Sequence, residues 1–231
     1  MSLLLQIQTV PDSLTNPEIT EKKLSVVDLI TSGGIGGNLV MGALGILSIF
    51  AIYILIERFS AIKKASKEDE NFLKSIQNFV EAKDIEAAKK LCKNTDSSIS
   101  RMIEKGVNRI NKPMTDISAA IENQGKLEVF KMENNLANLA TISGAAPMIG
   151  FLGTVIGMIV AFHEMASAGG NIDVEMLSKG IYTAMTTTVA GLIVGIIAFI
   201  AYNYLVSKVD KVVFMLEAKT TEFLDLLHHN E

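Results

Sequence analysis

Residues 139–162 read LATISGAAPMIGFLGTVIGMIVAF and contain no charged side chain. At about 1.5 Å per residue, a helix of this length crosses a hydrocarbon core of about 30 Å. Its small residues recur at steps of four and three, which places them on one helical face. Small residues let helices approach closely in lipid, where the hydrophobic effect does not drive helix association. The run therefore predicts a membrane-spanning helix inside a bundle, with a small-residue face of Ser143, Pro147, Gly150, Thr154, Gly157 and Ala161.

A second run, residues 181–205, reads IYTAMTTTVAGLIVGIIAFIAYNYL and has the same character. Its broad small-residue side consists of Ala184, Thr187, Thr188, Gly191, Gly195 and Ala198. We expect the two helices to face each other or a shared axis, with helix packing assigned to Pro147, Gly150, Gly153, Gly157, Gly191 and Gly195.

The hydroxyls on these two helices allow two interpretations. A threonine in a membrane helix ordinarily donates to the carbonyl four residues earlier and does nothing more. Four threonines of the two runs together weaken this interpretation, because hydroxyls that face a narrow bundle could hold water, an ion or the carboxylate of a partner. These residues are Thr154, Thr186, Thr187 and Thr188.

The whole chain has the composition of a membrane protein. Of its 231 residues 49% are hydrophobic, the mean hydropathy is +0.35, and the excess lies in three segments. The net charge of −4 comes without a basic patch interleaved with aromatics, which argues against nucleic-acid binding. The single cysteine, Cys92, excludes an internal disulfide and is expected to be a small core residue.

These patterns predict an all-α membrane protein with three transmembrane helices and long cytoplasmic helical extensions. We expect no cleaved signal peptide at the start, where the basic residues and long apolar stretch of a signal are missing. The first span is rich in Leu, Ile and Phe around its circumference and should be a lipid-facing outer helix. The expected division is 1–37, periplasmic arm and interfacial helix ended by glycines; 38–57, first span, ended by Glu57 and Arg58; 58–138, cytoplasmic helical domain; 139–162, second span; 163–180, short periplasmic loop; 181–206, third span; and 207–231, cytoplasmic C-terminal helix.

The cytoplasmic domain is patterned as short amphipathic helices, one of them capped by Asp84. A further helix should begin after Pro113, capped by Thr115 or Asp116, and run without interruption into the membrane near Leu139. The periodic pattern after Leu205 indicates that the third span also leaves the membrane unbroken. The acidic residues of this region are expected on solvated helix faces.

Basic residues near the span ends set the orientation, because positive residues stay on the cytoplasmic side. The smaller set, Lys22, Lys23 and Lys179, lies on the side of the N-terminus. The N-terminus is therefore predicted to be periplasmic and the C-terminus cytoplasmic. The larger set consists of Arg58, Lys63, Lys64, Lys67, Lys126, Lys131, Lys208, Lys211 and Lys219.

The three predicted spans lack the charged and acid–base side chains that carry protons or catalyse reactions. Residues 38–56, 139–162 and 181–205 contain no Asp, Glu, Lys, Arg or His, although intramembrane proton carriers are ordinarily ionisable. His163 is expected to be a polar anchor at the interface. The chain shows no phosphate loop, triad spacing or HExxH motif, so we predict no enzyme, no cofactor and no resident metal.

Several short stretches carry a resemblance to a known family. They are residues 139–142 (LATI), 146–147 (AP), 153–158 (GTVIGM), 190–192 (AGL) and 201–204 (AYNY), together with Gly150 and the IER at 56–58. These residues, the three-span layout and the large cytoplasmic insertion resemble the ExbB/TolQ/MotA ion-channel motor family over roughly residues 25–220, with ExbB the nearest comparison and TolQ the second.

The resemblance implies a homo-oligomer, a pentamer, in the bacterial inner membrane. Its second and third helices would line a pore around the single membrane helices of an ExbD- or TolR-like partner, whose Asp carries the ion. Such complexes use the proton motive force to move TonB or TolA, in the TonB case for outer-membrane active transport. Thr154 and Thr188 match the family's pore threonines, and the predicted pore lining is Thr154, Thr187, Thr188 and Thr183.

Two departures from the family pattern matter. Thr183 stands where many ExbB and TolQ proteins have a glutamate, and Ile197 replaces the family's usual proline. The missing glutamate leaves open whether the transported ion is H⁺ or Na⁺, because oxygen clusters also ligate Na⁺. The function expected is an ExbB-like channel-forming motor subunit; the alternatives are a TolQ-like envelope-integrity motor, a sodium-driven variant, or a non-conducting membrane scaffold.

Overall fold

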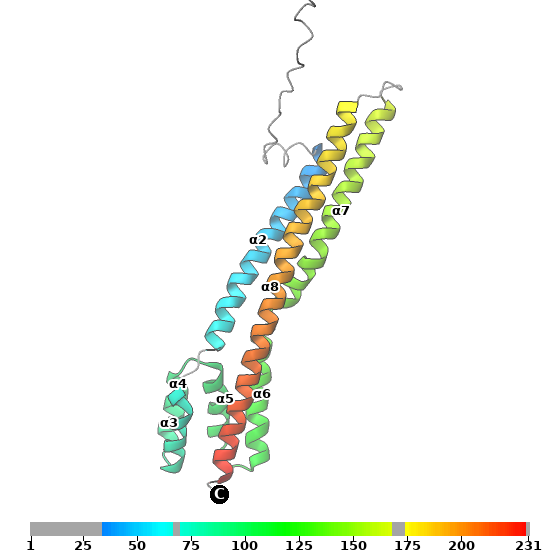
Figure 1. The fold of residues 1–231 in the computed structure, drawn as a ribbon. Coiled ribbons are helices and arrows are strands. Elements are labelled where there is room, and N and C mark those ends of the chain that lie inside the picture. The colour runs from blue at the N-terminus through cyan, green and yellow to red at the C-terminus, as the bar shows by residue number, and fades with distance from the viewer. Residues whose placement is uncertain (1–33, 67–69, 168–173, 230–231) are drawn as a thin grey trace, which may run out of the picture.

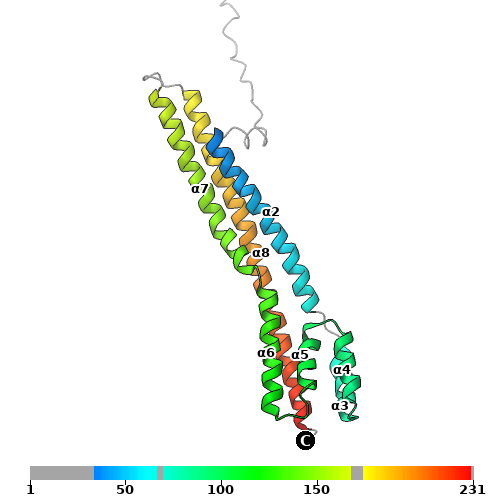
Figure 2. The same ribbon diagram turned by 180° about the vertical axis from the view of Figure 1, so that it is seen from behind.

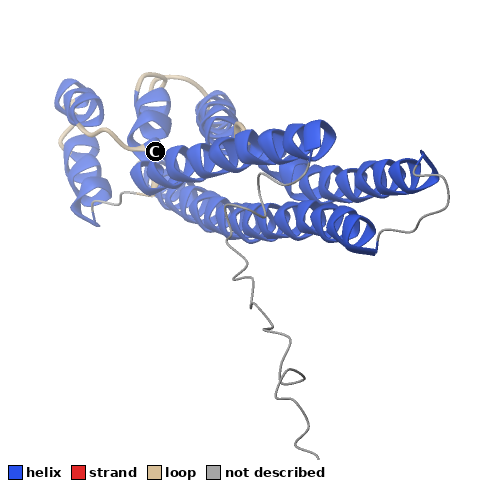
Figure 3. Ribbon diagram, turned by 90° about the horizontal axis from the view of Figure 1, so that it is seen from above, coloured by secondary structure: helices blue, strands red, loops and turns tan. Residues whose placement is uncertain are grey.

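A computed structural model describes residues 34–66, 70–167 and 174–229 of the chain. Every regular element in these residues is an α-helix (Figure 3). The helices are α2 (Gly34–Ala65), α3 (Glu70–Glu81), α4 (Ile85–Asn94), α5 (Ser98–Val107), α6 (Met114–Glu133), α7 (Leu136–Ser167) and α8 (Val174–His229). The all-α prediction is confirmed for this part. The expected interfacial helix before residue 34 and the turn at 168–173 lie outside the described residues.

The helices α2, α7 and the upper part of α8 form an elongated bundle. The helices α3 to α6 gather beside the lower, C-terminal part of α8 (Figure 1). The described residues contain three helices that are long and apolar enough to cross a membrane. Their exposed surface is apolar: Leu39, Ile46 and Ile49 of α2 are each about 70% exposed. Large apolar side chains in such numbers are stable against lipid or another protein, so we treat the chain as a membrane protein.

One helix, α8, joins the two ends of the molecule. It runs without a break from Val174 to His229, so the periodic pattern after Leu205 does continue the same helix. Its lower part packs on the short helices: Phe223 is fully buried, and a Cβ added to Gly106 of α5 would lie only 2.9 Å from its ring. At about 1.5 Å per residue, its 56 residues extend over about 84 Å.

The predicted unbroken helix from Pro113 into the membrane is wrong. α6 ends at Glu133, and α7 begins at Leu136. Between them Asn134 is extended (φ −51°, ψ 139°) and Asn135 is left-handed (φ 63°), which bends the chain (Figure 2). Asparagine tolerates this conformation because its short polar side chain bonds locally; here Asn138 donates to Asn135 Oδ1 at 3.3 Å. The prediction failed because it considered only proline and glycine as helix breakers.

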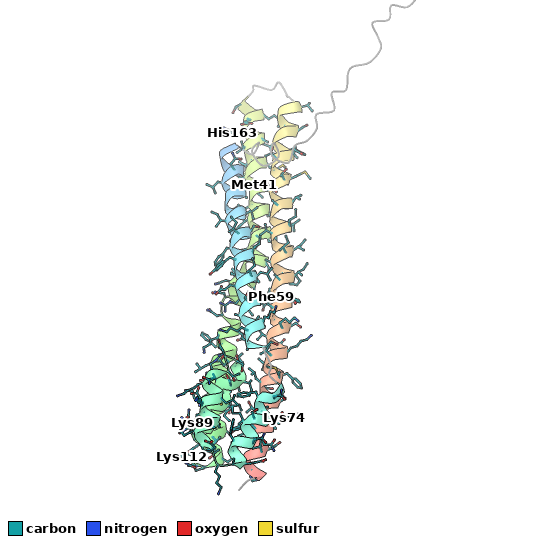
Figure 4. All side chains as sticks on the ribbon, turned by 90° about the vertical axis from the view of Figure 1, so that its left-hand side faces the viewer. Met41, Phe59, Lys74, Lys89, Lys112 and His163 are labelled. Carbon is teal, nitrogen blue, oxygen red and sulfur yellow. The ribbon has the colours of Figure 1, made fainter. Side chains whose placement is uncertain are left out.

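Several other expected helix ends also differ. α2 includes Gly36 and Gly37 and continues past Glu57 to Ala65. Arg58 lies inside the protein at only 7% exposure, where it donates to Lys131 O at 2.9 Å and pairs with Glu57. α7 likewise runs past His163, near the upper end in Figure 4, to Ser167.

Of the two predicted helix caps, the one at the N-terminus of α6 is wrong and the one at the N-terminus of α4 is confirmed. α6 starts after Pro113, not at a side-chain cap from Thr115 or Asp116. Pro113 has the fixed φ that suits a helix start, and its carbonyl accepts the N–H of Asp116 at 2.8 Å. At α4, Asp84 accepts from the N–H of Ala87 at 3.0 Å, so the predicted cap is confirmed.

The predicted core role of Cys92 is also confirmed, since it is 2% exposed. Burial, followed by the negative charge of Glu104, raises the pKa of this thiol to about 12. The thiol is therefore protonated at neutral pH and packs as a small apolar group.

Candidate functional site

The two helices α7 and α8 approach each other closely along a line of glycines. A Cβ added to Gly150 would lie 2.7 Å from the carbonyl oxygen of Thr187. One added to Gly191 would lie 2.6 Å from the carbonyl oxygen of Ala146 and 2.9 Å from Gly150 Cα. Backbone atoms cannot move aside as a side chain can, so these positions require glycine at this helix separation.

The contact continues along the rest of the small-residue face. A Cβ on Gly157 would meet Ala184 Cβ at 2.7 Å, and one on Gly195 would meet Pro147 Cγ at 2.6 Å. Gly153 is enclosed from two helices, by Thr187 of α8 and by Val40 of α2. The structure therefore places all the predicted packing residues in the helix interfaces.

A cluster of hydroxyl groups lies in the middle of this interface, which we call the threonine cluster: Thr154, Thr187 and Thr188 with the carbonyls of Gly150 and Ala184. Thr154 donates its hydroxyl across the interface to Ala184 O at 3.0 Å and touches the hydroxyl of Thr188. Thr188 reaches Gly150 O at 3.2 Å, and Thr187 lies within 3.1 Å of the same carbonyl. Thr154 and Thr188, 34 positions apart in the sequence, thus share one polar site between two apolar helices.

The four predicted pore residues are not equivalent in this structure. Thr187 is 2% exposed and Thr183 9% exposed, because both point into the packed interior of the chain. Thr154 and Thr188 are only partly buried. Within this single chain Thr187 and Thr183 are thus enclosed by neighbouring helices, whereas Thr154 and Thr188 keep part of their surface exposed. The lining of a pore by these four residues stays a prediction.

The threonine cluster can hydrogen-bond but cannot titrate. Its groups are neutral hydroxyls and carbonyls, which accept or donate hydrogen bonds and can ligate a cation through oxygen. Within the described residues no group of three or more His, Cys, Asp or Glu side chains could hold a metal ion. The spans thus offer hydrogen-bonding oxygen atoms at this site and no Asp, Glu, Lys, Arg or His side chain.

The sequence analysis missed the burial of one acidic side chain. It placed the acidic residues of the cytoplasmic region on solvated helix faces, which is wrong for Glu128 of α6, because this residue is only 2% exposed. Its carboxylate accepts hydrogen bonds from Arg101 at 2.6 Å, Lys131 at 2.9 Å, Gln124 at 2.9 Å and Ser98 at 3.0 Å. Burial by itself would raise the pKa of Glu128, but the bonds from Arg101, Lys131 and Ser98 outweigh it and lower the pKa to about 2.

A signal for this burial was present in the sequence. Ile117, Ile121, Glu128 and Met132 follow one another at steps of four, seven and four residues, which puts Glu128 on the buried stripe of α6. The bonds around it connect α5 with α6 directly below the Asn134 bend, and the carbonyl of Lys131 in turn accepts from Arg58 of α2.

We expect Glu128→Gln to destabilise the protein by about 2 kcal/mol at pH 7, because it removes the negative charge from a buried group that accepts hydrogen bonds from Arg101 and Lys131. A carboxyl with a lowered pKa contributes stability above its unfolded pKa, 4.5, and loses it as the pH falls through its folded pKa, about 2. The difference in melting temperature between the variant and the unmodified protein should therefore be largest at neutral pH and shrink between pH 4.5 and 2.

The control is Glu122→Gln on the same helix, which removes the exposed pair with Lys126 and should leave melting unchanged. Equal effects of the two variants, or a difference from the unmodified protein that stays constant down to pH 2, would contradict the stabilising role of the buried charge.

A family model, described as the MotA/TolQ/ExbB proton channel family, matches residues 94–218 of the chain. The match is more than half of the 231 residues and includes α5, α6, α7 and most of α8. Both partly buried threonines of the threonine cluster lie inside it.

Curated relatives point in the same direction. A protein of Methanothermobacter thermautotrophicus described as a biopolymer transport protein ExbB homolog is 26% identical over 187 residues, 80% of this chain and 64% of the relative. The biopolymer transport protein ExbB of Helicobacter pylori is 40% identical over 79 residues, 34% of this chain and 54% of the relative. The Tol-Pal system protein TolQ of Pseudomonas aeruginosa is 24% identical over 215 residues, 88% and 93% of the two chains. The chain thus spans less than two thirds of these two ExbB relatives but nearly all of TolQ.

Proposed function

The chain belongs to the MotA/TolQ/ExbB proton channel family, and we propose that it is the channel-forming subunit of an ExbB-like motor in the bacterial inner membrane. With an ExbD- or TolR-like single-span partner, it would convert the proton motive force into mechanical work on a TonB-like protein. The names of the two ExbB relatives, biopolymer transport proteins, support this choice.

The observation that carries the proposal is the pairing of Thr154 and Thr188 across two uncharged spans inside the matched region. A partner carboxyl beside these hydroxyls would be neutral along the apolar part of its path, because desolvation raises a carboxyl pKa, and ionised where it meets water. The chain would supply the polar wall, and the partner the ionisable group. Ion flux through liposomes, with and without the co-purified partner, tests this division of roles.

Exposed apolar side chains outside the spans support a homo-oligomer, for which we propose a pentamer. Phe130 of α6 and Phe214 of α8 are 70% and 74% exposed, and both lie beyond the uncharged runs. Large apolar side chains at an aqueous surface favour burial against another protein. The basic residues near the span ends support an orientation with this region in the cytoplasm and the N-terminus in the periplasm.

A TolQ-like role is the second candidate, favoured by the alignment over 93% of the length of a TolQ. Expression with an ExbD-type or a TolR-type partner, in cells that lack the corresponding motor, separates the two roles. An ExbB-like subunit restores energy-dependent uptake, and a TolQ-like subunit restores envelope integrity.

Replacing Thr154 or Thr188 with valine should reduce ion flux through the complete complex about fivefold, while the oligomer still assembles. Valine nearly conserves the volume of threonine and deletes one hydrogen-bonding group, whose net contribution is about 1 kcal/mol. The matched control is Thr186→Val, because Thr186 donates only to Tyr182 O within its own helix. Unchanged flux in both test variants would show that these threonines are structural only.

A further inference from the structure

A groove of about 930 Å³ lies between the lower ends of the spans α2 and α8. Lysines and aromatic rings dominate its lining, and no carboxylate is among the described residues that line it. We propose that this groove binds the headgroup of an anionic phospholipid. The proposal goes beyond ion conduction, and it rests only on the chain spanning a membrane. The residues that carry it are Lys63, Lys64, Lys208 and Lys211 with Phe59 and Tyr204.

Two stacked aromatic rings, one from each helix, line the groove. Phe59 of α2 and Tyr204 of α8 stack with their centroids 6.4 Å apart, and the ammonium group of Lys208 lies 5.5 Å from the Tyr204 ring centroid. Phe59 is labelled on the lower part of α2 in Figure 4. A cation held over a ring is attracted by its π-face and stays oriented toward the groove.

Within the described residues, most of the positive charge in the groove is not neutralised by an ion pair. Lys64 pairs with Asp96 at 2.6 Å. Neither Lys63, Lys208 nor Lys211 makes an ion pair with any residue in the described part of the chain. Three unpaired cations around one concave surface favour an anionic ligand.

The groove lies at the depth of lipid headgroups. The uncharged runs end at Ile56 in α2 and Leu205 in α8, and the three lysines follow about 5–11 Å further along the helices at about 1.5 Å per residue. The headgroup region on each side of a bilayer is about 5–8 Å thick, and a lysine side chain extends toward it.

The surface above the groove identifies the ligand as a lipid and not as a free phosphate. Ile56 and Ile200, one turn nearer the membrane centre, are 62% and 63% exposed. Apolar side chains therefore stand above the cations on both helices, as an amphiphile with a phosphodiester head and hydrocarbon tails requires. A free phosphate has no hydrocarbon tail to contact that apolar surface.

The test places a fluorescent reporter in the groove. The chain has no tryptophan, so Tyr204→Trp gives a single reporter beside the lysines. In vesicles of mixed phosphatidylcholine and phosphatidylglycerol, one lipid or the other is brominated on its acyl chains to quench the reporter. We expect brominated phosphatidylglycerol to quench at least fivefold more effectively, since one lysine near anionic lipid contributes roughly a fivefold preference.

A reporter at Tyr53 on the lipid-facing part of α2, Tyr53→Trp, is the control for unselective lipid contact and should show no preference. Changing Lys63, Lys208 and Lys211 to Gln together should abolish the preference at position 204. Changing Lys74 of α3, Lys90 of α4 and Lys112 before α6 instead removes equal charge outside the groove and should leave the preference intact. Lys74 and Lys112 are labelled near the lower end of the molecule in Figure 4.

Raising the salt to about 1 M should also abolish the preference in the protein with all its lysines, which avoids dependence on how the triple variant folds. Equal quenching by both lipids at position 204 would overturn the proposal. Quenching by neither lipid would overturn it as well, because another protein surface, such as a second copy of the chain, would then cover the groove. Ion flux does not enter this test, so its failure is separate from failure of the proposed function.

Discussion

Reconstituted alone in liposomes, this protein is expected to show no ion flux above that of empty vesicles, and to gain flux only when a partner supplies an intramembrane carboxylate. The spans contain no ionisable side chain, and the threonine cluster consists of neutral groups. A proton therefore has no site at which to pause inside the bilayer.

The available driving force is adequate for such a complex. One charge that falls through about 100 mV releases roughly 2.3 kcal/mol, comparable to rearranging a few hydrogen bonds at the boundary between subunit and partner. We expect the co-purified complex to conduct, and the complex with the partner's aspartate changed to asparagine to fall to the background rate.

Dyes that report pH and sodium inside the liposomes measure the flux and identify the ion. Strong flux from the subunit alone would contradict the two-component mechanism. Absence of flux from every complex would favour a non-conducting scaffold. A response of the sodium dye alone would identify a sodium-driven variant, which the oxygen atoms around Thr154 and Thr188 would accommodate.

The second large effect is expected at the closest helix contact. Gly191→Leu places a Cβ 2.6 Å from Ala146 O, and neither backbone can yield without separating α7 from α8. Overpacking of this kind ordinarily costs about 1–3 kcal/mol, and we expect the upper end or more because backbone atoms are involved. The loss should appear as a lower melting temperature in detergent and as failure to form the oligomer in native mass spectrometry.

The matched control is Gly144→Leu, because Gly144 lies on the facing helix α7 but a Cβ there has no neighbour within 4 Å. It adds the same side chain to a glycine of the same spans and should leave the melting temperature near that of the unmodified protein. An unchanged oligomer and melting temperature in Gly191→Leu would show that small-residue packing does not hold these helices together.

The spans were predictable because each is marked by a long uncharged stretch of sequence and by small residues that repeat along it. A run without charge fixes the existence of a helix, and the repeated small residues fix the face that meets its neighbour, as Gly150 and Gly191 do. The bend at Asn134 and Asn135 was not predictable in the same way, because asparagine is also compatible with a continuous helix.

The threonine cluster was predictable in outline and not in detail. The stripes place Thr154 and Thr188 near each other, but consecutive residues on a helix point about 100° apart. Whether Thr186, Thr187 or Thr188 faces α7 depends on how α8 is rotated about its own axis. The structure settles this rotation by burying Thr187 and leaving Thr186 bonded within its own helix.

Because α8 is unbroken, the direction in which its upper side chains point fixes the direction in which its lower side chains point. Gly191 must face α7 while Phe223 faces the short helices, and no loop between them can absorb a change in length. Deleting one residue between these positions would turn the lower face by about 100° relative to the upper one, whereas inserting seven would leave the two faces within about 20° of register. Insertions and deletions accepted during evolution should therefore be confined to the connections outside α8, or occur within it as whole heptads.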